Sequence, residues 1–177
     1  MLKQFIIQFD TSLTAYIQQW PGWLRVPMLI ATFIGQPLVL IAAAGTVGLL
    51  AWQRYNTGII FAMGAGLAAM LFNTLVKHFV HRTRPDTLYV SEMWFATSSF
   101  PSGHAFGSMV ILGSLGYLGA QHLAAPWNTI APISLGLLIF IIGVSRIYLG
   151  AHFPTDVIAG WVLGACVLAI IIVLARL

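Results

Sequence analysis

Long apolar segments separated by short polar connections occupy most of this sequence between residues 24 and 175. A helix needs about 20 predominantly apolar residues to cross a bilayer, and the chain is 59% hydrophobic but only 7% charged. A soluble domain carries about 25% charged residues. The pattern therefore predicts an all-α protein, a polytopic transmembrane helical bundle in which residues 1–177 form a single domain.

Five spans are expected within the bundle, which is assigned to residues 24–177. The first span contains Gly35-Gln36-Pro37, which predicts a kink. Gly160 and Gly164 in the last span would let neighbouring helices approach closely. The five expected spans cover residues 24–52, 58–80, 104–123, 130–144 and 157–175.

Residues 1–20 are more polar than the spans. Apolar residues recur there at three- and four-residue steps, which predicts an amphipathic helix that lies in the membrane interface. Its remaining surface is expected to carry Lys3, Gln4, Gln8, Asp10, Thr11 and Gln18. The alternative is that this segment also crosses the membrane, which would give six spans.

Three polar clusters fall on the same side of the membrane when the five crossings are counted. They are the segment from Lys77 to Pro85, the segment from Pro101 to His104 and the segment from Ser145 to Asp156. Ionisable residues at membrane depth are costly and usually functional. The convergence of these clusters predicts one site at a membrane surface.

The first property expected of this site is affinity for an anion. Lys77, Arg84 and Arg146 bring three cations to one face, and guanidinium groups can hold two phosphate oxygens at once. Ser102 and Gly103 precede a helix start, where backbone N–H groups without internal partners bind anions. The eight basic residues of the chain form no continuous stripe, so no nucleic-acid partner is expected.

The second expected property is nucleophilic chemistry at His152. Asp156 follows four residues later and can hold one imidazole nitrogen, which leaves the other free to react. His104 is placed where it could protonate a leaving oxygen. A metal site built from His104, His152 and Asp156 is the rival interpretation, but three nearby cations would repel a divalent ion, so no metal and no cofactor is expected.

Other polar residues receive weaker interpretations. His78, His81 and His122 are expected to be structural. Asp86 and Glu92 either tune the site or are simply solvated.

The three clusters resemble the phosphatase signature of the type 2 phosphatidic acid phosphatase family. Lys77 is followed after six residues by Arg84-Pro85, residues 101–104 read PSGH, and Ser145-Arg146 is followed by His152 and Asp156 at the family's spacing. The resemblance covers residues 58–175 closely and the first span loosely. The commonest membrane members have six spans, with a full transmembrane helix before the equivalent of residues 1–20, and here that helix is expected to be missing or replaced by the interfacial one.

The resemblance implies a metal-independent phosphatase. His152 would attack phosphorus to form a phosphohistidine, Asp156 would support it, and His104 would protonate the leaving group. Water would then hydrolyse the intermediate. The residues implied to hold the phosphate are Lys77, Arg84, Ser102, Gly103 and Arg146.

The resemblance also implies a setting for this chemistry. The expected substrate is a lipid phosphate or diphosphate, with undecaprenyl diphosphate favoured and phosphatidylglycerophosphate or phosphatidic acid next. The expected partners are this substrate and the lipids of the cell (inner) membrane, with the site facing the periplasm or the extracellular side. The alternatives are halide oxidation and a non-catalytic protein that binds or transports lipid phosphates.

Overall fold

A computed structural model describes residues 1–51, 71–91 and 98–175, and every regular element in these ranges is helical. The prediction of an all-α fold is confirmed for this part of the chain. Most of the expected second span and Glu92 lie outside the described residues. Residues 71–79 are helical, and the other helices are α1 (Leu2–Gln18), a short 3₁₀ helix (Gly22–Leu24), α2 (Arg25–Ile34), α3 (Pro37–Ala51), α5 (Leu88–Ser91), α6 (Gly103–His122), α7 (Trp127–Tyr148) and α8 (Pro154–Ala175).

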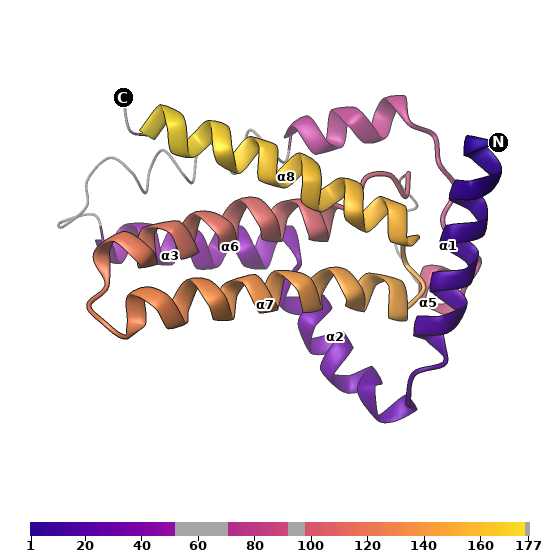
Figure 1. Cartoon of the computed structure of the whole chain (residues 1–177), viewed down its shortest axis with the longest axis horizontal. Helices are drawn as coiled ribbons and strands as arrows, with labels where there is room; N and C mark the ends of the chain where they lie inside the picture. The colour runs from indigo at the N-terminus through magenta and orange to yellow at the C-terminus, as the bar shows by residue number, and fades with distance from the viewer. Residues whose placement is uncertain (52–70, 92–97, 176–177) are drawn as a thin grey trace.

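Helix α6 lies at the centre of the bundle. It packs extensively against α7 and α8 and also contacts α3, and these helices run alongside one another in Figure 1. Helix α1 instead lies across one end of the bundle, where α7 ends and α8 begins, and contacts both. This arrangement brings the N-terminal helix next to the third polar cluster.

Two described helices are long and apolar enough to cross a membrane, α7 over Trp127–Tyr148 and α8 over Pro154–Leu174. A third candidate is the pair Gly22–Ile34 and Pro37–Ala43, which is bent by 61°. This bend confirms the predicted kink. The kink forms because Pro37 lacks the N–H that would continue the helix from α2. The chain is a membrane protein with at least two candidate spans.

The ends of α7 and α8 differ from the expected boundaries. The predicted spans at 130–144 and 157–175 lie inside these helices, but α7 continues through Ser145 and Arg146 and α8 already includes Asp156. Arg146 and Asp156 thus lie in helical turns and not in a connecting loop. Their positions are therefore fixed by the backbone hydrogen bonds of two long helices.

Glycines let α8 approach α6 closely. A Cβ atom at Gly160 would lie 2.8 Å from the carbonyl oxygen of Ser102, and one at Gly164 would lie 2.8 Å from the Cβ of Met109. Real Cβ atoms essentially never lie within 3.0 Å of such neighbours. The predicted close approach of helices at these two glycines is confirmed.

We expect Gly160→Ala to destabilise the protein by roughly 1–3 kcal/mol, because the added methyl group overpacks the contact between α8 and the start of α6. Thermal unfolding of the purified protein in detergent measures the effect. Gly136→Ala is the matched control, since a Cβ at this position on α7 meets nothing within 4 Å. Equal unfolding temperatures for the two variants would contradict the packing argument.

Helix α1 is confirmed as a helix, but one of its polar residues points the other way from the expectation. The prediction that Asp10 lies on the solvated surface is wrong, because Asp10 is only 1% exposed. Large apolar side chains of α1, among them Leu2, Phe5 and Tyr16, are exposed instead. The reason is that Asp10 has charged and polar partners inside the protein, which are described below.

Candidate active site

The end of α7 is shaped by Gly150, which has a positive φ of 72°. The N–H of Gly150 donates to the carbonyl of Ile147, and the N–H of Ala151 donates to the carbonyl of Arg146, both at 2.9 Å. These two bonds form a Schellman motif, which ends a helix with a residue in the left-handed region. The turn places His152 directly after the last turn of α7, which carries Arg146.

The start of α8 holds Asp156. Pro154 occupies the first helical position, where its missing N–H costs nothing. The Oδ2 atom of Asp156 accepts a hydrogen bond of 3.0 Å from the backbone N–H of Phe153, the residue before the helix. This is half of a capping box, and the carboxylate is also favoured at the positive end of the helix dipole.

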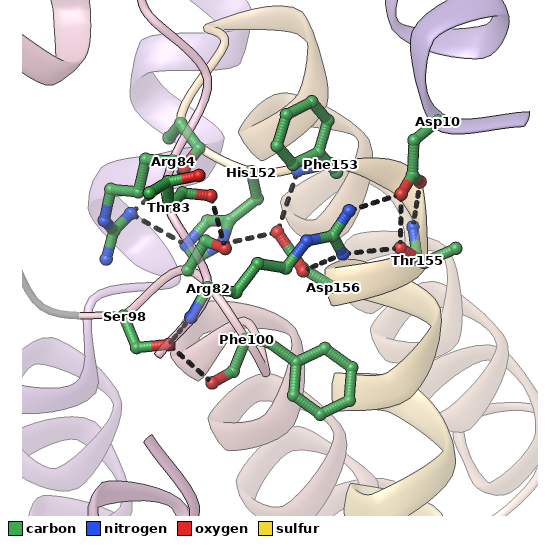
Figure 2. A network of polar contacts seen from close by, with 12 residues as sticks. Asp10, Arg82, Thr83, Arg84, Ser98, Phe100, His152, Phe153, Thr155 and Asp156 are labelled. Carbon is green, nitrogen blue, oxygen red and sulfur yellow. Dashed lines mark hydrogen bonds and ion pairs between the residues drawn. The ribbon is translucent and has the colours of Figure 1, made fainter. Parts of the chain in front are cut away.

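His152 faces Asp156 with one ring nitrogen and Arg84 with the other (Figure 2). Its Nδ1 lies 3.7 Å from Oδ2 of Asp156, which is longer than a hydrogen bond. Its Nε2 lies 3.2 Å from Nη1 of Arg84. Because an arginine only donates, the network assigns the acceptor role to Nε2 and the proton to Nδ1. The lone pair of Nε2 therefore points toward the cationic side of the site.

Burial controls the ionisation of His152. It lowers the pKa of His152 from 6.5 to about 4, because the imidazolium loses its hydration. The nearby carboxylate of Asp156 raises this pKa in part, and the positive charges of Arg146 and Arg84 lower it. The imidazole is thus neutral throughout the physiological pH range, which is the form that can act as a nucleophile.

We expect the acid limb of kcat/KM that belongs to His152 to lie near pH 4. The neutral ring is reactive, so activity is retained above the folded pKa of about 4 and is lost only as the pH falls through that value. A phosphate monoester itself titrates near pH 6, so the substrate has to be titrated separately. An enzyme limb near pH 6.5 would contradict the burial argument.

The structure brings the cations of all three clusters together around His104. Lys77, Arg84 and Arg146 all lie close enough to His104 to interact with it electrostatically, as does His152. Each cation is held in place by protein oxygen atoms. Lys77 donates to the carbonyl of Ser98 and Arg84 to the carbonyl of Ala151, both at 3.0 Å. Arg146 is buried and donates to the hydroxyls of Thr32 and Tyr89.

The second cluster forms the start of α6. Ser102 is fully buried, and its backbone N–H donates to the carbonyl of Asp156 at 3.0 Å, which joins the second cluster to the third. Within the described part of the chain its Oγ has no hydrogen-bond partner. Gly103 follows at the first helical position, where a Cβ would lie 3.2 Å from the Nδ2 of Asn73. The site thus combines a helix N-terminus with an available hydroxyl.

Three residues of this region were missed by the sequence reasoning. Arg82 forms ion pairs with Asp10 and with Asp156 of the third cluster. Asn73 is buried one helical turn before Lys77. The sequence did contain a signal for Asp10. The chain has only four acidic residues, and an acidic residue in an apolar chain is usually paired with a cation.

An open groove of about 1060 Å³ runs beside the first cluster. Its lining includes Lys77, Arg84, the exposed His78 and His81, and the exposed Asp86. Within residues 1–51, 71–91 and 98–175, no three His, Cys, Asp or Glu side chains are grouped closely enough to hold a metal ion. Because Lys77, Arg82 and Arg84 lie in its lining, the groove carries positive charge and suits an anionic head group.

The sequence profile of the PAP2 superfamily matches residues 56–176 of the chain. This stretch includes all three polar clusters and most of the described bundle. The chain therefore belongs to the PAP2 superfamily, and the predicted family is confirmed.

Individual relatives are also phosphatases. Phosphatidylglycerophosphatase B of Bacillus subtilis is 30% identical over 149 residues, which cover 80% of this chain and 70% of that protein. An undecaprenyl-diphosphatase of Sulfolobus acidocaldarius is 34% identical over 124 residues, covering 68% of this chain and 56% of that protein. The chain is a phosphatase of this superfamily.

The fold has a counterpart among solved structures. The crystal structure of a transmembrane PAP2-type phosphatidylglycerolphosphate phosphatase from Bacillus subtilis superposes with a TM-score of 0.83 at 23% identity, covering 99% of this chain and 94% of that one. The likeness includes almost the whole chain, so α1 belongs to the shared fold.

Proposed function

We propose that the chain hydrolyses a lipid phosphate or diphosphate at the membrane surface through a phosphohistidine, without a metal ion. The observation that carries this proposal is the pairing of a buried, neutral His152 with a cluster of three cations. The Nε2 lone pair of His152 faces Arg84 at 3.2 Å, and all three cations interact electrostatically with His104. A phosphate bound among them would meet the nucleophile directly.

The first chemical step forms the phosphoenzyme. Lys77, Arg84 and Arg146 hold the phosphate oxygens together with the hydroxyl of Ser102 and the backbone N–H of Gly103, and they neutralise charge in the transition state. Nε2 of His152 forms a bond to phosphorus while the bond from phosphorus to the leaving oxygen breaks. The negative charge of the bound phosphate offsets the neighbouring cations and favours a protonated His104 ring, which gives its proton to that oxygen. Asp156 stabilises the positive charge that develops on the His152 ring.

The second step releases phosphate. His104, now neutral, takes a proton from water as the water oxygen attacks phosphorus. The bond between phosphorus and Nε2 breaks, and the electron pair returns to the ring. Free phosphate and the starting form of both histidines result, so neither an oxidant nor a cofactor is required.

The proposed topology has five spans with α1 in the membrane interface. Support comes from the bent pair α2 and α3, from α7 and α8, and from the exposed apolar side chains of α1. The site then lies at one membrane surface, which suits a substrate whose tail stays in the bilayer. We place the chain in the cell (inner) membrane with the site on the outer side.

The substrate is proposed as a class. Relatives are named for phosphatidylglycerophosphate and for undecaprenyl diphosphate, and both present a terminal phosphate on a membrane-held tail. Undecaprenyl diphosphate stays the first expectation. The groove beside Lys77 and Arg84 offers space and positive charge for either head group.

Phosphate release by the purified protein tests the proposal. The substrates are undecaprenyl diphosphate, phosphatidylglycerophosphate and phosphatidic acid, each assayed with and without EDTA. We expect release from at least one of them and no loss with EDTA. Absence of release from all three would refute the proposed function, and loss of activity with EDTA would refute the metal-free mechanism.

A further inference from the structure

Arg82 lies in the segment after helical residues 71–79, and its guanidinium sits between two carboxylates from distant parts of the chain (Figure 2). Its Nη2 lies 2.5 Å from Oδ2 of Asp10, and its Nη1 lies 2.6 Å from Oδ1 of Asp156. The Arg82 side chain is 26% exposed, whereas the two carboxylate side chains are at most 2% exposed. Two buried negative charges therefore share one arginine.

Asp10 also binds the first turn of α8. Its Oδ1 accepts a hydrogen bond of 2.9 Å from the backbone N–H of Thr155, and its Oδ2 accepts one of 2.7 Å from the Thr155 hydroxyl. The N–H groups of a first turn have no partner within their own helix. A side chain of α1 thus caps α8 and fixes the position of the residue before Asp156.

The two carboxylate oxygens of Asp156 bind different groups. Oδ1 binds Arg82. Oδ2 accepts from the backbone N–H of Phe153 at 3.0 Å and lies 3.7 Å from Nδ1 of His152. A charge-assisted hydrogen bond to Oδ1 is strong and directional, so it prevents the carboxylate from rotating away from His152.

We propose that Asp10 and Arg82 are positioning residues of the phosphatase reaction, which hold Asp156 so that it can orient His152. The inference rests on the proposed roles of His152 and Asp156. Arg82 already binds two carboxylates and the hydroxyl of Thr155, so its charge serves Asp156 and not the substrate. In this way α1 contributes a side chain to the site.

Three variants of the full chain test the proposal: Asp10→Asn, Arg82→Gln and Arg82→Lys. We expect the first two to lower kcat about 10-fold to 100-fold, the range found for partners that orient a histidine from behind, with KM changed less than about threefold. Arg82→Lys should recover part of kcat, because lysine keeps the charge but loses the planar fork. These assays use the lipid phosphate that the unaltered protein hydrolyses fastest.

A double variant and a matched control sharpen the test. Asp10→Asn combined with Arg82→Gln should lower kcat by less than the product of the two single effects, because both residues act on the position of Asp156. Thr11→Ala is the control on α1: Thr11 is exposed, and its hydroxyl bonds carbonyls of its own helix. Its kcat should stay at the level of the unaltered protein.

Rapid-quench trapping of the phosphoenzyme separates this inference from the proposed function. We expect the unaltered protein to form a phosphoenzyme and the folded Asp10→Asn variant to form it more slowly. If the unaltered protein forms none, the proposed function fails and this inference fails with it. If it forms one and Asp10→Asn forms it at the same rate, only the positioning role is overturned.

Two further outcomes are decisive. A raised KM with unchanged kcat in Arg82→Gln would make Arg82 a substrate-binding residue and overturn the proposal. If Arg82→Gln does not fold, as judged by thermal unfolding in detergent, Asp10→Asn decides alone, since it keeps the shape of the side chain and removes its charge.

Discussion

His152→Ala should reduce kcat to the background of the assay, a loss of roughly 10⁴-fold or more, the size seen when a catalytic nucleophile is removed. The reason is that the Nε2 lone pair of His152 points toward a cation at 3.2 Å, where a phosphate would bind, while a carboxylate lies behind the ring. Initial rates of phosphate release at saturating substrate measure the effect.

The control for this prediction is His122→Ala. His122 is an exposed histidine in the last turn of α6, at the opposite end of that helix from His104. Its variant should keep kcat within about twofold of the unaltered protein, as surface substitutions away from a site do. If His152→Ala retained comparable activity, another group would have to be the nucleophile.

Much of the candidate site could be predicted because its residues carry charge into an apolar chain. Lys77, Arg84 and Arg146 have few ordinary reasons to lie at membrane depth, and counting the crossings placed them on one face. The structure brings these three cations within electrostatic reach of His104, and Arg84 and Arg146 within reach of His152. In the structure, the Gly150 turn ends α7 and Pro154 begins α8, which sets the local geometry of the third cluster.

The role of Asp10 could not be predicted from periodicity. A polar residue on an amphipathic helix is normally assigned to water, and that rule describes local pattern only. Here the partners of Asp10 come from residues 82 and 155, which are distant in sequence. Burial of the carboxylate is favourable only because both partners are present together, and their meeting depends on the tertiary packing of α1 across the bundle end.

Helix lengths were underestimated for a related reason. Hydropathy located the apolar centres of α7 and α8 but stopped at their first polar residue. Ser145 and Arg146 remain helical because they are buried against other parts of the protein, and α7 stops only where Gly150 adopts a positive φ. A helix end is thus set by capping geometry, which hydropathy does not report.

Asp156→Asn should lower kcat by orders of magnitude with a smaller change in KM. The amide has one acceptor oxygen, whereas the carboxylate uses one oxygen for Arg82 and the other for the Phe153 N–H beside His152. If the amide oxygen still accepts the hydrogen bond from Arg82, the NH₂ group faces Nδ1 of His152. This favours the tautomer in which Nε2 carries the proton and therefore cannot attack. The equivalent change in a serine protease triad costs about 10⁴-fold in kcat. Steady-state kinetics measures the split, and a change confined to KM would contradict the orienting role. Arg84→Gln provides the contrast, because loss of a phosphate-holding cation should raise KM as well as lower kcat.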